Sequence, residues 1–231
     1  MKGYAECWVL GNHLSNIAFA RQPDVEGFIR GLYDGTAKIP GNEVFNQWVD
    51  LIDLTLEFGN ANPLQTDYNT QVTEFAVGNA AMTQQGNWTQ VAVLQTNPDL
   101  KHGFLPMPIN NNAEEMDKLA VGVPSNWVVY NKSPVKEEAK AFLNWMVSSE
   151  VGQRYIVEEF KFIPAFKNIP ADESVLGPMA ADIIRYSQAG KTIPWTWFMF
   201  PNGEATSNKF SDILQAYIGG QINREQLLEN M

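Results

Sequence analysis

The sequence is poor in cysteine, histidine and basic residues. Its 231 residues include one cysteine, Cys7, and two histidines. A single thiol can form no internal disulfide and supplies no cysteine quartet for a metal. Sixteen lysines and arginines stand against 26 acidic residues, and basic residues never run more than two in a row. Nucleic acid and anionic membranes require a clustered basic face, so neither is expected as a partner.

Long apolar runs are also missing. No stretch approaches 18 consecutive apolar residues, so no membrane-spanning helix is predicted. The first six residues contain one lysine and no apolar segment follows it, so no export signal is expected in the sequence as written. Hydrophobic residues make up 45% and charged residues 18% of the chain, which is the balance of a folded globular protein rather than a disordered one.

The common catalytic and cofactor motifs are absent. The sequence contains no phosphate-binding loop, dinucleotide fingerprint, zinc-protease motif or nucleophile elbow. His13 and His102 lie far apart, and a surface or capping role is favoured over a catalytic triad for either. The segment Asp67-x-Asn69-x-Gln71 opens like a calcium loop, but it lacks the later glycine and glutamate ligands. We therefore expect neither a metal nor a cofactor.

Three glutamate doublets keep one enzymatic alternative open. Glycoside hydrolysis requires two carboxyl groups that flank the sugar. Adjacent helical residues point about 100° apart, so the doublets Glu114-Glu115, Glu137-Glu138 and Glu158-Glu159 are more simply explained as solvated helix faces. A carbohydrate-active hydrolase or lyase with paired carboxylates remains the alternative to a binding protein.

The pattern of apolar residues and caps predicts an α/β fold of about eight helices and four or five short strands. Apolar stripes predict helices over 43–58, 69–77 and around 210–218, and Asn223 with Gln226 predicts a capping box. Helices are also expected after Ser133-Pro134, from Ser149, over 174–189, and after Asn87 as an N-cap. Strands are expected at 80–83, 103–109 and within 119–130.

Four tryptophans lie outside the helical stripes, at Trp8, Trp88, Trp195 and Trp197. Such tryptophans either fill a satellite core or form a stacking platform for a ligand. Sites for neutral ligands with polar edges combine aromatic rings with a few carboxylates and amides. Glu6 lies two residues before Trp8, and Asn87 directly precedes Trp88.

One segment of the sequence carries a specific resemblance. Phe75-Ala-Val-Gly-Asn-Ala-Ala-Met-Thr-Gln-Gln-Gly-Asn-Trp88 resembles the signature of bacterial extracellular solute-binding proteins of the carbohydrate ABC-transporter type, the group that includes maltose-binding protein. The strand-like segment 103–108, the helix pair over 139–153 and Ile163-Pro164-Ala165 resemble later blocks of the same family in the same order.

This resemblance implies a periplasmic-binding-protein-like fold of two α/β lobes and a non-catalytic function. A sugar or oligosaccharide would bind in the cleft between the lobes and be delivered to the permease subunits of an ABC importer, outside the cytoplasm, in the periplasm or on a cell-surface lipoprotein. The implied ligand-binding residues are Glu6, Trp8, Asn87, Trp88, Trp195 and Trp197. The match of Glu6-Cys7-Trp8 is the weaker one, because Cys7 and Trp8 replace the family's proline and tyrosine.

The resemblance also implies a chain that is truncated at its N-terminus. Residues 1–119 would form the first segment of the second lobe, 120–160 a crossover with a strand and helix pair of the first lobe, and 161–231 the return segment. The helix with Ala139, Phe142, Leu143 and Met146 would then expose an apolar stripe. An uncovered apolar patch favours association, so self-association or weak sugar binding is expected.

Overall fold

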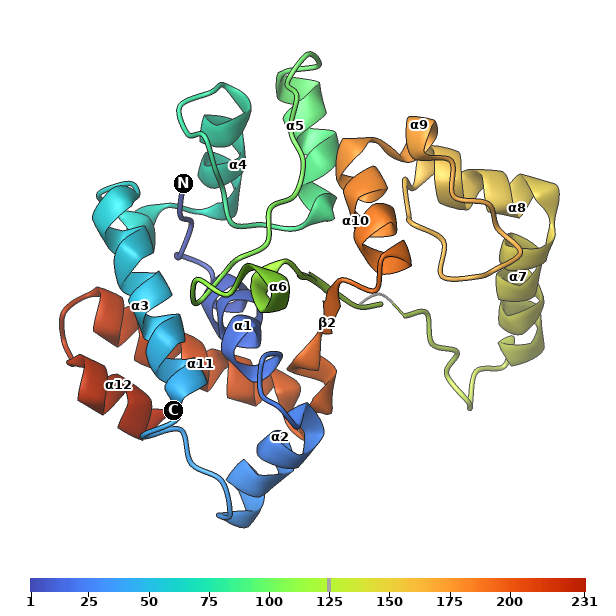
Figure 1. Ribbon diagram of the computed structural model, residues 1–231. Helices are drawn as coiled ribbons and strands as arrows, with labels where there is room; N and C mark the ends of the chain where they lie inside the picture. The colour runs from blue at the N-terminus through green and yellow to red at the C-terminus, as the bar shows by residue number, and fades with distance from the viewer. Residues whose placement is uncertain (124–125) are drawn as a thin grey trace. The chain divides into compact units, whose positions relative to one another are not determined.

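The computed structural model describes residues 1–123 and 126–231, and the chain divides into two compact units (Figure 1). The first unit contains Met1–Leu100, Leu105–Ala120 and Lys191–Met231. The second unit contains Lys101–Phe104 and Val121–Gly190. The lobe assignment made from the resemblance remains a prediction.

Helices dominate the first unit, and short helical turns connect them. In chain order they are η1 (Val9–Leu14, a π-helix), α1 (Ser15–Phe19), α2 (Val25–Asp34), α3 (Glu43–Phe58), η2 (Pro63–Gln65), α4 (Tyr68–Ala76), η3 (Asn87–Thr89), α5 (Gln90–Thr96), α6 (Ala113–Met116), η5 (Thr196–Met199), α11 (Gly203–Ile218) and α12 (Arg224–Asn230).

The longest predicted stripe forms the helix that the sequence indicates. The Asn42 side chain caps α3 by accepting a hydrogen bond from Phe45 N, and the helix ends before Gly59. Its apolar residues Phe45, Trp48, Val49 and Ile52 are all buried. The prediction over 43–58 is therefore confirmed, because cap, period and stop signal agree along the same segment.

The core of the first unit lies where η1, α1, α3 and α11 meet. Phe19 packs edge-on against Phe45 at 5.0 Å between ring centroids and stacks on Phe210 at 5.5 Å. Trp48 is fully buried, and its Nε1 donates to Leu14 O at 2.8 Å. Gly11 faces α11 so closely that a Cβ there would lie 2.0 Å from Ser207 O. Only glycine permits this approach of η1 to α11.

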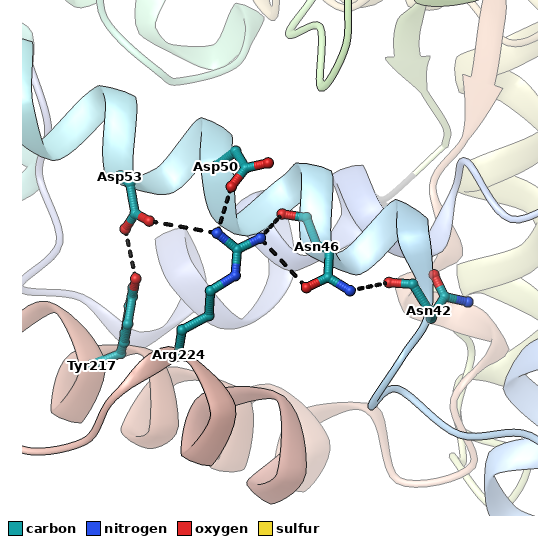
Figure 2. A network of polar contacts seen from close by, with 6 residues as sticks. All are labelled: Asn42, Asn46, Asp50, Asp53, Tyr217 and Arg224. Atoms are coloured by element: carbon teal, nitrogen blue, oxygen red, sulfur yellow. Dashed lines mark hydrogen bonds and ion pairs between the residues drawn. The ribbon is translucent and has the colours of Figure 1, made fainter.

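Polar contacts join α3 to α11 and α12 on the surface of the first unit (Figure 2). The guanidinium of Arg224 forms an ion pair with Asp50 and also donates to the backbone oxygen of Asn46. Tyr217 Oη donates to Asp53 at 2.6 Å. Burial, with this hydrogen bond as the second cause, raises the pKa of Tyr217 to about 12. These contacts hold the C-terminal helices against α3.

The sheet is much smaller than predicted. Two strands, β1 (Leu119–Val121) and β2 (Thr192–Pro194), form a small parallel pair, in which Leu119 N donates to Lys191 O at 3.1 Å. The mixed helical fold with this sheet agrees with the predicted α/β class. The count of four or five strands is wrong for the residues that the structure describes, and Pro124 and Ser125 of the predicted 119–130 segment lie outside them.

Neither of the two other predicted strands forms. At 80–83, the N-terminal amino group of Met1 donates to Met82 O, and the side chain of Gln71 donates to Thr83 Oγ1 at 2.9 Å. At 103–109, Phe104 N donates to the Asp182 carboxylate at 2.7 Å, while Pro106 and Pro108 have no N–H to donate. These isolated hydrogen bonds do not make the repeated backbone ladder that a strand requires.

The second unit is helical throughout its regular elements. It contains α7 (Lys136–Ser148), α8 (Glu150–Arg154), η4 (Tyr155–Glu159), α9 (Glu173–Leu176) and α10 (Pro178–Gln188) around a small core that includes Met146, Ile156 and Leu176. A helix begins at Ser149 as predicted, and the Ser149 side chain caps α8 by accepting from Gly152 N. The helix predicted over 174–189 is split at Gly177, whose φ of 89° is left-handed.

Among residues 1–123 and 126–231, no helix is both long and apolar enough to cross a membrane.

Candidate functional site

Five rings from four separate segments of the first unit form an aromatic cluster. It consists of Trp8, His13, Tyr68, Trp88 and Trp195. The imidazole of His13 lies 4.8 Å from Trp8, 4.9 Å from Trp88 and 5.0 Å from Trp195, measured between ring centroids. Trp8 also contacts Trp88 at 6.2 Å and Tyr68 at 5.8 Å. Three of the four tryptophans selected from the sequence are thus brought together around one histidine.

The cluster is open to solvent on the side of Trp88. The side chain of Trp88 is 44% exposed, whereas Trp8, His13 and Trp195 are each partly buried. A tryptophan that packs only as core is usually more deeply covered, as Trp48 is in this chain. The cluster therefore presents an indole surface that another molecule can reach.

His13 is the central ring, and the sequence-based expectation of a surface or capping role for it is wrong. It follows Trp8 by five residues, and the π-helical turn η1 between them brings residues five apart onto one side. Burial lowers the pKa of His13 to about 4, so the imidazole is neutral at physiological pH. No sequence signal predicts a π-helical turn, which explains why the residue was missed.

A buried asparagine positions Trp195. Asn16 Oδ1 accepts hydrogen bonds from Thr196 N at 2.7 Å and Thr196 Oγ1 at 2.8 Å, and its Nδ2 donates to Pro194 O at 3.2 Å. The Asn16 side chain is almost fully buried. These bonds attach the end of β2 at Pro194 and the start of η5 at Thr196 to α1. Trp195 lies between these two residues and is held in place by both.

Glu6 lies beside the cluster with one carboxylate oxygen free. Its Oε1 accepts a hydrogen bond from Tyr68 N at 2.9 Å, at the start of α4. Its Oε2 is buried and has no hydrogen-bond partner in the described part of the chain, and the same holds for Gln84 Oε1. A buried acceptor without a donor costs free energy, so a ligand that supplies O–H or N–H donors would be favoured there.

Two of the predicted ligand residues are placed differently. Trp197 is outside the aromatic cluster and lines a cavity of about 10 Å³ with Asn12, Asn16 and Phe200, room for about one water molecule. Asn87 is the first residue of η3 and not the N-cap, because Gly86 occupies that position. The expected capping role of Asn87 is therefore wrong, although it remains next to Trp88 in the chain.

The carboxylates considered from the sequence for catalysis or metal binding have other roles in the described ranges. All six residues of the glutamate doublets are exposed, as expected of solvated faces. Within residues 1–123 and 126–231, histidine, cysteine, aspartate and glutamate side chains form no group of three or more that could hold a metal ion. Asp67, from the calcium-like segment, instead caps α4 by accepting from Thr70 N at 2.7 Å.

Comparison with known proteins identifies the family. No curated protein matches the chain. The model of the family described as bacterial extracellular solute-binding protein matches residues 31–182, which is more than half of the sequence. This range contains the signature segment ending at Trp88 and the helix pair over 139–153. The chain therefore belongs to the bacterial extracellular solute-binding proteins.

Proposed function

We propose that this protein binds a sugar or oligosaccharide on the indoles of Trp8, Trp88 and Trp195 and delivers it to an ABC importer. The observation that carries the proposal is the aromatic cluster around His13, with Trp88 exposed to solvent and an unpartnered carboxylate oxygen of Glu6 beside it.

Family membership supports the general part of this function. Extracellular solute-binding proteins bind a ligand without catalysis, act outside the cytoplasm and serve transport in partnership with ABC transporters. That the ligand is a carbohydrate, that it lies in the cleft implied by the resemblance, and that the protein resides in the periplasm or on a lipoprotein are parts of our proposal.

The chemistry of the cluster favours a carbohydrate. A sugar ring has a face of C–H groups, which packs against an indole, and an edge of hydroxyl groups, which donate hydrogen bonds. Trp88 offers the indole face, and Glu6 Oε2 offers the acceptor. His13 is neutral, because its burial lowers its pKa to about 4, so it adds no charge that an uncharged ligand would have to desolvate.

Calorimetric titration with a panel of glucose, maltose, maltotriose, cellobiose, N-acetylglucosamine and sorbitol tests the proposal. At least one sugar should bind, and Trp88→Ala should weaken its binding about fivefold or more, since an aromatic contact contributes about 1 kcal/mol or more. The melting temperature of Trp88→Ala should change little. A matched control is Trp145→Ala in the second unit, whose indole is similarly exposed at 42% and should not affect binding.

Three results would contradict this function. Failure of every panel sugar to bind at millimolar concentration would remove the carbohydrate. A loss of about 3 to 5 kcal/mol in the unfolding free energy of Trp88→Ala would identify Trp88 as core instead. Turnover of the oligosaccharides that disappears in Glu6→Gln would favour the hydrolase alternative.

A further inference from the structure

We propose that Gln71 and Gln85 are positioning residues of the ligand platform, which hold the indole of Trp88 in one orientation before the ligand arrives. This inference rests on the proposed role of Trp88 as a platform. Neither glutamine was selected from the sequence as a site residue.

A relay of hydrogen bonds connects Trp88 to the interior of the first unit. Trp88 Nε1 donates to Gln85 Oε1 at 3.2 Å, and Gln85 Nε2 donates to Gln71 Oε1 at 2.8 Å. An indole nitrogen can only donate, so it requires the oxygen of Gln85 to face it. This choice turns the Gln85 amide nitrogen toward Gln71 and so sets the direction of the whole relay.

Gln71 is the buried end of this relay. Its side chain is fully buried, and its Nε2 donates to Thr83 Oγ1 at 2.9 Å and to Gln84 O at 3.1 Å. Gly3 has no side chain, which leaves room for this amide, because a Cβ at that position would lie only 2.5 Å from Gln71 Oε1. Gln71 therefore attaches the segment that precedes Trp88 to α4.

Gly86 leaves room for the indole in the same orientation. Its φ of −116° is ordinary for any residue, so its backbone does not require glycine. A Cβ there would instead lie 2.1 Å from the six-membered ring of Trp88. The indole thus lies across Gly86 with its nitrogen held by Gln85, two independent contacts that select one side-chain rotamer.

Fixing this rotamer matters for affinity. An exposed side chain that moves freely must lose rotamer freedom when a ligand binds, and preorganisation removes that cost from the binding step. Without the relay, Trp88 would still be present but would spend part of its time in orientations that do not match the ligand. The expected consequence is weaker binding with little loss of fold stability.

Nuclear magnetic resonance of the ligand-free protein tests the positioning directly. The indole N–H signal of Trp88 is assigned by its loss in Trp88→Phe. In Gln85→Leu this signal should shift and its exchange with solvent should be at least tenfold faster. Gln85→Glu keeps an acceptor for the indole but loses the donor to Gln71 Oε1, so its exchange rate should lie between those of the wild type and Gln85→Leu. The exposed Gln95→Leu on α5 should leave the signal unchanged. With the tightest-binding panel sugar, Gln85→Leu should bind three- to tenfold more weakly.

An unchanged Trp88 signal and exchange rate in Gln85→Leu would overturn the proposal, as would an exchange rate in Gln85→Glu equal to that of the wild type. Should Gln85→Leu fail to fold, Gln85→Ser, whose side chain is too short to reach the indole, decides in its place. If no panel sugar binds, the proposed function fails while the ligand-free spectra still decide the positioning. If a sugar binds and Gln85→Leu leaves Trp88 unaffected, the positioning alone fails.

Discussion

A single histidine organises the candidate site at the residue scale. His13 contacts three indoles, and burial lowers its pKa to about 4 from its ordinary value of 6.5. The unfolded chain therefore takes up a proton at a higher pH than the folded chain does. The contribution of His13 to stability is full above pH 6.5 and is lost as the pH falls toward 4.

The unfolding free energy should accordingly fall by about 3 kcal/mol between pH 7 and pH 4 through His13 alone. Urea denaturation followed by fluorescence at several pH values measures this. His13→Phe retains a ring at this position and removes the proton, so its stability should depend less steeply on pH over the same interval. Parallel pH profiles for the wild type and His13→Phe would show that His13 is not the responsible group.

At the scale of the element, capping residues decide where helices begin. Asn223 caps α12 in a capping box, in which Gln226 N donates to Asn223 Oδ1 at 2.9 Å and Asn223 N donates to Gln226 Oε1 at 2.9 Å. The box was predicted from the sequence and is confirmed. The helix it starts buries Leu227 and Leu228, so the cap contributes to the core of the first unit.

Asn223→Ala should reduce the unfolding free energy by about 1 kcal/mol, because the backbone amide of Gln226 at N3 loses its acceptor. Chemical denaturation measures the change. Asn230→Ala, at the other end of the same helix and exposed, should have an effect of less than about 0.5 kcal/mol. Equal losses in the two variants would mean that the box does not stabilise α12.

At the scale of the whole molecule, the chain exposes aromatic side chains that a stable monomer usually covers. On α7 of the second unit, Phe142 is 55% and Trp145 is 42% exposed, and their rings stack at 5.7 Å between centroids. Met146 on the same helix is buried, so the helix has one packed side and one exposed apolar side. Exposed apolar pairs of this kind favour association between copies of the chain.

The wild-type chain should therefore self-associate as its concentration rises, which sedimentation velocity detects. Phe142→Lys should shift the distribution toward monomer, because a charge on the stacked pair must be desolvated in any contact. Phe58→Lys, at a position on α3 that is 76% exposed in the first unit, is the matched control and should not change association. A concentration-independent monomer for the wild type would contradict the prediction.

The local signals in the sequence predicted local structure well. The apolar stripe over 43–58, the helix start at Ser149 and the Asn223 box each depend on residues close in the sequence, so neighbouring residues are sufficient to define them. The strands failed because a strand depends on a partner elsewhere in the chain. At 80–83 and 103–109 the chain forms isolated hydrogen bonds to Met1, Gln71 and Asp182 instead of pairing with a strand, and no local pattern encodes this.

The sequence by itself determined the residue types of the candidate site and, through the segment ending at Trp88, the family. Only the tertiary structure decided which of these residues meet. Trp8, Trp88 and Trp195 converge on His13 because buried amides fix distant segments to one another: Asn16 holds Thr196 across 180 residues, and Gln71 holds the segment before Trp88. Such contacts gain free energy only when the whole core has formed, so neither periodicity nor spacing along the chain reveals them.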